Sequence, residues 1–126
     1  MPKEPIYTPD APDPGPYSQA IKYGNLVFVA GQTSEDPVTN KPVHGSVADQ
    51  TERILNNIQT ILKAAGSSLD KVVRSDVYIS DMKYKDEMNA TYRKFFPDAL
   101  PARNCVAVAG IDDGLDVEIE VIAGID

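Results

Sequence analysis

The chain has 126 residues, of which 42% are hydrophobic and 25% charged, as expected for one globular domain with its own core. A formal net charge of −7 and a pI near 4.6 argue against a nucleic-acid-binding surface, because such surfaces concentrate Lys and Arg. With one cysteine (Cys105) and one histidine (His44), the chain has no intrachain disulfide, and a protein-built zinc site is disfavoured.

The N-terminal segment, residues 1–16, is rich in proline and predicts an extended stretch over the surface, not a signal peptide. The wholly apolar run at residues 26–30 is far too short to span a bilayer. We therefore expect a single domain over residues 1–126, located in the cytoplasm and without membrane contact.

The first predicted strands are residues 18–23 and 26–30, joined by a turn at Gly24-Asn25. Because every residue of 26–30 is apolar, the second strand is expected to be buried on both faces. From residue 46 the apolar residues recur at steps of three and four, which predicts an amphipathic helix over 46–65. Ser46 is a suitable N-cap and Gly66 a suitable C-terminal stop for this helix.

A further strand is predicted at residues 71–79. Asp81 can then cap a second helix, whose apolar stripe continues until Pro97 ends it. This stripe consists of Tyr84, Met88, Tyr92, Phe95 and Phe96.

The last two strands, 103–109 and 115–121, alternate with period two, and Asp113-Gly114 between them predicts a hairpin. Whether the loop has two or four residues, odd-numbered residues of the first strand share a face with even-numbered residues of the second. That face would carry Arg103, Cys105 and Ala107 together with Asp116, Glu118 and Glu120.

The element order β-β-α-β-α-β-β predicts an α+β fold in which two helices pack on one face of a mixed β-sheet. The other face of the sheet then needs a cover, and self-association is the usual one.

Taken singly, none of the candidate residues is a specific signal of chemistry. The fork of Arg103 suits a planar carboxylate, but it also suits an ordinary ion pair. Glu118 and Glu120 can supply a general base or form a solvated face, and Cys105 can be a nucleophile or a small buried residue. Tyr17 and Asn89 fit packing and helix solvation as well as ligand contact.

Taken together, four segments resemble the RidA/YjgF/UK114 family over nearly the whole chain. They are GPYSQA at 15–20, GNLVFVAGQ at 24–32, NATYRKFF at 89–96, and PARNCV at 101–106 with VEIE at 117–120. The resemblance implies a chorismate-mutase-like (YjgF-like) fold assembled as a homotrimer, with active sites in clefts between subunits.

The resemblance also implies a 2-iminobutanoate/2-iminopropanoate deaminase that hydrolyses enamines and 2-imino acids to 2-keto acids and ammonia, with no metal or cofactor. By similarity, Arg103 holds the substrate carboxylate, while Glu118 and the Cys105 backbone carbonyl position the attacking water. The implied substrate-binding residues are Tyr17, Ala30, Gly31, Asn89 and Arg103.

Departures from the family pattern keep alternatives open. Ala30 stands where active members often carry Ser, Ala107 occupies a position that is often acidic, and the stretch between Phe96 and Pro101 is short. The alternative to catalysis is a module that binds a small carboxylate such as a 2-keto acid. Endoribonuclease activity, reported for some members, is disfavoured by the acidic composition.

Overall fold

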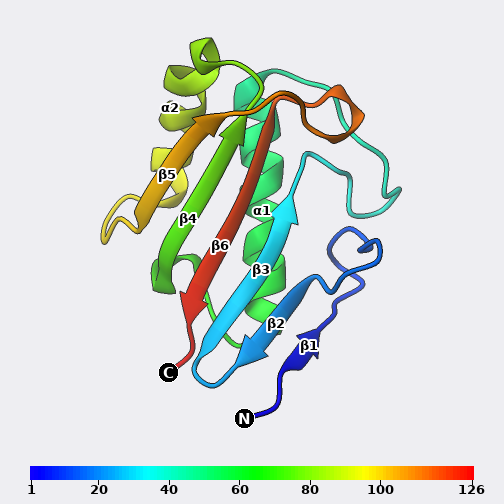
Figure 1. Cartoon of the computed structure of the whole chain (residues 1–126), viewed down its shortest axis with the longest axis vertical. Helices are drawn as coiled ribbons and strands as arrows, with labels where there is room; N and C mark the ends of the chain where they lie inside the picture. The colour runs from blue at the N-terminus through cyan, green and yellow to red at the C-terminus, as the bar shows by residue number, and fades with distance from the viewer.

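Six strands form one mixed sheet in the order β1-β2-β3-β6-β4-β5, and both helices lie on the same face of it (Figure 1). The computed structural model describes residues 1–126. The strands are β1 (Glu4–Ile6), β2 (Ala20–Tyr23), β3 (Leu26–Gln32), β4 (Val72–Ile79), β5 (Ala102–Ala107) and β6 (Val117–Gly124). The helices are α1 (Val47–Ala64) and α2 (Lys85–Phe95), with short 3₁₀ turns at Leu69–Lys71, Met82–Tyr84 and Asp112–Gly114. The predicted fold class, an α+β sheet with two helices on one face, is confirmed.

Helix α1 begins and ends where the local sequence predicts, and α2 ends as predicted but begins at Lys85, later than the predicted cap at Asp81. The Ser46 side chain accepts a hydrogen bond from the backbone N–H of Asp49, and Gly66 takes a φ of 80° directly after the C-cap of α1. Asp81 caps the 3₁₀ turn that leads into α2, and α2 ends one residue before Phe96-Pro97.

The core lies between α1 and the central strands. Ile54, Ile58 and Ile61 of α1 are fully buried, and they pack in one cluster with the inward residues of β3 and β6. Strand β6 alternates strictly between buried and half-buried residues, with Val117, Ile119, Val121 and Ala123 on the helix side. Such alternation fits a central strand whose second face is left open.

The predicted hairpin between the last two strands is wrong. Strand β5 pairs in parallel with β4, while β6 inserts between β3 and β4 and is antiparallel to both. The turn itself exists, since Asp113 and Gly114 have φ values of 61° and 68°, but it belongs to a longer connection over residues 108–116 that crosses the end of β4. A strand that follows the α2 crossover pairs in parallel with the strand before it, and this pairing prevails over the turn signal.

One further expectation needs correction, and the extended course predicted for the N-terminal segment gains a strand pairing. Phe28 in β3 is 40% exposed, so this apolar strand is buried only on its helix side in the single chain. Within the proline-rich N-terminal segment, residues 4–6 form strand β1, which pairs with the edge of β2. The Gly24-Asn25 turn is confirmed, because Tyr23 pairs with Leu26 across it and Gly24 has a φ of 62°. Neither helix has the length and apolar character needed to cross a bilayer.

Candidate functional site

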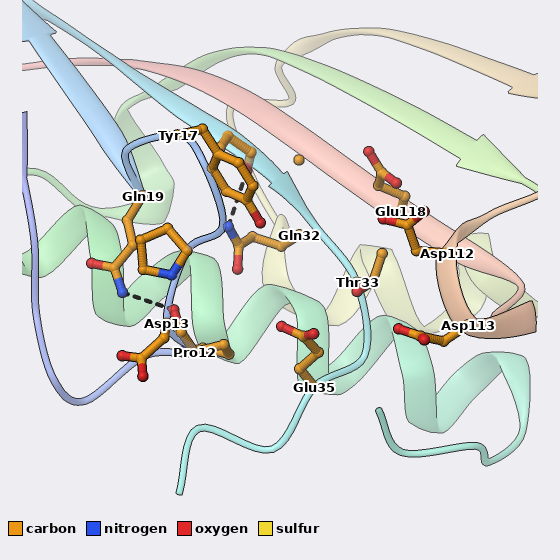
Figure 2. Close-up of a pocket in the computed structure, with 13 residues that line it drawn as sticks. Pro12, Asp13, Tyr17, Gln19, Gln32, Thr33, Glu35, Asp112, Asp113 and Glu118 are labelled. Atoms are coloured by element: carbon orange, nitrogen blue, oxygen red, sulfur yellow. Dashed lines mark hydrogen bonds between the residues drawn. The ribbon is translucent and has the colours of Figure 1, made fainter. Parts of the chain in front are cut away.

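One cavity, of about 270 Å³, collects four of the predicted site residues at the end of β3 (Figure 2). Tyr17 comes from the loop before β2, Ala30 and Gly31 from β3, and Glu118 from the start of β6. The prediction from sequence that these residues meet is therefore supported by the geometry, although their chemical roles stay predictions.

A β-bulge shapes this cavity. The register between β3 and β6 shifts between Val29 and Gln32, so that Ala30 and Gly31 stand at the irregularity. A Cβ atom on Gly31 would lie 2.3 Å from Oε2 of Glu118, which is closer than any van der Waals contact. The absence of a side chain at Gly31 therefore makes the space in which the Glu118 carboxylate sits.

The loop that carries Tyr17 is fixed by Gln19, whose side chain is buried. Its Nε2 donates to the backbone carbonyl of Pro12 (Figure 2). The same Nε2 donates to the backbone carbonyl of Thr8, and Oε1 accepts from the backbone N–H of Thr8. Three hydrogen bonds from one buried amide hold the proline-rich segment against β2. Tyr17, which is 54% exposed, is thereby presented at the rim of the cavity.

The lining of this cavity is strongly acidic. Besides Glu118 it includes Asp13, Glu35, Asp112 and Asp113, and it includes no Lys, Arg or His. The pKa of Glu118 is raised mainly by burial, and to a smaller extent by the negative charges of Asp112 and Glu120. The pKa of Glu35 is likewise raised mainly by burial, and to a smaller extent by the negative charges of Asp113 and Asp112. No group of three or more His, Cys, Asp or Glu side chains has the arrangement of a metal site.

Glu120, the other carboxylate of β6, has a hydrogen-bond partner. The hydroxyl of Tyr78 on β4 donates to it, and this bond is the largest of the effects that raise the pKa of Tyr78 to about 12. Glu118 makes no such bond within the chain. Of the two carboxylates, Glu118 is therefore the one left free to act on a ligand.

A second cavity, of about 210 Å³, lies where α2 meets the start of β5 and contains Arg103 and Asn89. Nη1 of Arg103 donates to Oδ1 of Asn89 over 2.7 Å, and the guanidinium carbon lies 4.8 Å from the centroid of the Tyr92 ring. The same guanidinium forms no salt bridge in the chain. Nη1 also donates to Sδ of Met88 over 3.9 Å, so Arg103 is oriented by three neutral groups of α2 and keeps the rest of its fork available for a carboxylate.

Cys105 lines neither of these cavities, and its half-buried side chain packs against the core. The backbone carbonyl of Cys105, by contrast, is accessible, as the hydrogen bonds between β5 and β4 show. The N–H of Val108 donates to the carbonyl of Ile79, so the even-numbered residues of β5 face β4 and the odd-numbered ones face away. The Cys105 carbonyl therefore points to the open edge of the sheet, where it can accept a hydrogen bond from outside the chain.

The prediction that Arg103 and Glu118 share a face of the sheet is wrong. Arg103 contacts Asn89 and Tyr92 of α2, on the helix side, whereas Glu118 alternates with the buried Val117 and Ile119 and lies on the opposite side. The reason is the position of β4 between β5 and β6, which removes the predicted pairing. The chain thus carries two separate groups of site residues, an acidic one around Glu118 and a basic one around Arg103.

Several lining residues were not singled out from the sequence. Asp113 is a turn residue in the sequence pattern, whereas Asp112 and Glu35 lie outside any distinctive motif. Arg93 and Leu100 of the second cavity likewise carried no signal. Their roles depend on which loops meet in space, and only the spacing of Asn89, Tyr92 and Arg93 on one helix could have indicated a shared face.

The raised pKa of Glu118 predicts a stability effect. We expect Glu118→Gln to raise the free energy of unfolding at pH 7, by at most about 1 kcal/mol because solvent screens a half-buried group. The Glu118 carboxyl binds its proton more tightly in the folded protein than in the unfolded chain. The stability gained by Glu118→Gln therefore develops as the pH rises from the ordinary pKa of 4.5 through the raised value. It vanishes at lower pH, where both states are protonated.

Urea unfolding of both proteins between pH 3.5 and 8 measures this difference. The exposed Glu52 on α1 provides a control, since Glu52→Gln should give no comparable trend. Loss of stability in Glu118→Gln at pH 7 would contradict the burial of an ionised carboxylate at this position.

The fold is that of an α+β domain with two separate cavities, and comparison with known proteins places it in a family. Residues 8–125 match the family model described as Endoribonuclease L-PSP. A RutC family protein of Pyrococcus horikoshii is 48% identical over 122 residues, which cover 96% of this chain and 97% of that protein. The chain therefore belongs to the RidA/YjgF/UK114 family.

Solved structures agree with this assignment. RidA from the Antarctic bacterium Psychrobacter sp. superposes with a TM-score of 0.93 at 38% identity, covering 97% of this chain and 99% of its own. Escherichia coli TdcF with bound serine superposes with a TM-score of 0.90 at 34% identity, covering 98% and 99%.

Proposed function

We propose that the protein hydrolyses 2-imino acids and their enamine tautomers to 2-keto acids and ammonia. The observation that carries the proposal is the charge separation between the two cavities. One holds a free carboxylate of raised pKa and no cation, and the other holds an oriented guanidinium and no carboxylate. A 2-imino acid needs both a cation for its carboxylate and a proton acceptor for the attacking water.

Arg103 and Glu118 lie on opposite sides of one sheet, so we propose that they act together only between two copies of the chain. The face that carries Glu118 exposes apolar side chains, among them Tyr23 at 46% and Phe28 at 40%, which favours its burial against further copies. We call the Glu118 cavity and the Arg103 cavity the two half-sites. Their charges are complementary, which favours contact between the acidic half-site of one copy and the basic half-site of another. We propose the homotrimer of the family as this assembly.

In the proposed mechanism Arg103 binds the substrate carboxylate through two parallel hydrogen bonds and so fixes the imine carbon. Water, held by Glu118 and the Cys105 carbonyl, attacks this carbon as Glu118 accepts one of its protons. The resulting carbinolamine loses ammonia after protonation of its nitrogen and leaves the keto acid. Tyr17 covers the ligand, Gly31 offers backbone contacts, and Asn89 orients Arg103. None of these steps needs a metal or cofactor.

Binding of a small carboxylate without catalysis is the second candidate. Ala30 supports it, since no hydroxyl is available at this position of the cavity lining. The TdcF structure holds serine, which shows that a related protein accommodates a small amino acid. RNA cleavage, suggested by the description of the family model, is disfavoured because carboxylates line the larger cavity and repel phosphate.

The test is an imine-trapping assay. An amino-acid oxidase generates 2-imino acids in situ, semicarbazide traps them, and the rate of semicarbazone formation is followed with and without the protein. We expect the protein to lower trapping in a concentration-dependent way. Unchanged trapping for several substrates, together with saturable binding of 2-keto acids, would favour the binding module. The cytoplasmic location stays a prediction.

A further inference from the structure

We infer that Arg93 is a second anion-binding group of the Arg103 cavity, so that the site takes 2-imino acids with a second carboxylate on their side chain. This inference deepens the proposed function and rests on it for the catalytic step, whereas the binding of the second anion is independent of catalysis.

Arg93 belongs to the same wall as the groups that orient Arg103. Asn89 and Arg93 are four residues apart on α2 and therefore share one face of the helix, with Tyr92 beside them. All three line the cavity that contains Arg103. Arg93 is exposed and forms no salt bridge within the chain, so its guanidinium is unpaired.

The lining of this cavity fits a dicarboxylate. It includes two arginines and no carboxylate, in a chain whose net charge is −7. Leu100 and Pro101 provide an apolar wall against which the methylene groups between two carboxylates can pack. The volume of about 210 Å³ is several times that of one water molecule, roughly 30 Å³, and leaves room for a small organic acid.

The other half-site makes Arg93 decisive for such a ligand. The cavity around Glu118 includes five carboxylates and no cation, so it repels a second negative group on the substrate. Arg103 is occupied by the carboxylate next to the imine. Arg93 is then the one cation in either lining that can hold the carboxylate at the far end.

A structural role for Arg93 has to be separated from this one. Arg93 and Lys94 both lie in the last turn of α2, where positive charge stabilises the helix through its dipole. Lys94 does not line the cavity. Lys94→Ala therefore removes the same helix-terminal charge and leaves the anion site untouched, which makes it the matched control for Arg93→Ala.

The experiment compares substrates that differ only in the terminal carboxylate. Imines are generated from aspartate and 2-aminobutanoate, and from glutamate and 2-aminopentanoate, and their hydrolysis is followed by semicarbazide trapping. We expect Arg93→Ala to lower kcat/KM for both dicarboxylic imines about tenfold, mainly through KM, and to change it less than about twofold for their partners. Lys94→Ala should leave all four values near those of the unmodified protein. Equal effects of the two substitutions, or an equal loss for both members of each pair, would overturn the inference.

A binding measurement distinguishes failure of this inference from failure of the proposed function. If the protein hydrolyses no imine, calorimetric titration with 2-oxoglutarate and with 2-oxopentanoate still probes the second anion site. Tighter binding of 2-oxoglutarate that disappears in Arg93→Ala supports the site without catalysis. Equal binding of the two acids, or a preference that survives Arg93→Ala, refutes it even where monocarboxylic imines are hydrolysed.

Discussion

Replacement of Arg103 by Ala is expected to lower kcat/KM for 2-imino acids at least about 100-fold, since loss of a bidentate charge-assisted pair removes roughly 3 kcal/mol of binding to the transition state. Arg103→Lys keeps the charge and loses the planar fork, so it should recover only part of this loss. The measurement is imine trapping at several substrate concentrations, which separates kcat from KM.

The fold should survive this substitution. Arg103 lies on the edge strand β5, and its side chain contacts three residues of α2: it donates to Oδ1 of Asn89 and to Sδ of Met88 and lies over the Tyr92 ring. Their loss is expected to reduce the free energy of unfolding by about 1 kcal/mol. Arg53→Ala on the exposed side of α1 is the control for removal of a positive charge. Full activity in a folded Arg103→Ala protein would refute the proposed deaminase.

Gly31→Ala is expected to reduce kcat/KM by about 10- to 100-fold while the protein stays folded. The added methyl group would lie 2.3 Å from Oε2 and 3.1 Å from Cδ of Glu118, so the carboxylate has to turn away. Because the obstructed atoms are at the end of a flexible side chain, the free energy of unfolding should change by less than about 1 kcal/mol. Trapping kinetics and thermal unfolding of the same preparations measure both effects.

Two comparisons make this prediction specific. Gly124→Ala adds a methyl group whose nearest neighbour, the backbone oxygen of Lys71, lies 3.9 Å away in ordinary van der Waals contact, and it should leave activity unchanged. In the double variant Gly31→Ala/Glu118→Gln the alanine should cause little further loss beyond Glu118→Gln alone, because both changes act on one carboxylate. If the loss of kcat/KM in the double variant equals the product of the two single losses, Gly31 affects activity independently of the position of Glu118.

Much of the local structure could be predicted because its causes are local. The caps of α1 at Ser46 and Gly66, the end of α2 before Pro97 and the turn at Gly24-Asn25 all follow from the conformational preferences of a few adjacent residues. The two amphipathic helices follow from apolar residues that recur every three or four positions. One apolar face on each helix also indicates that both helices cover a sheet. The site residues Tyr17, Ala30, Gly31 and Glu118 were identified by resemblance to a family, and the structure brings them to one cavity.

The pairing of strands could not be predicted in the same way. Asp113-Gly114 has the positive φ angles that its residues favour, yet the strands on either side of it do not pair. A turn signal reports only the local bend of the chain. The partner of each strand depends on how β6 buries Val117, Ile119 and Val121 under α1, which is a property of the whole core.

The helices, the turns, the family and the side-chain types available for chemistry can all be derived from the sequence, since they depend on neighbouring residues or on motifs. The position of β4 between β5 and β6 becomes visible only in the folded chain, and it places Arg103 and Glu118 on opposite sides of the sheet. The physical reason is the two-residue period of a strand, in which the choice of neighbour and register sets the face on which every side chain lies.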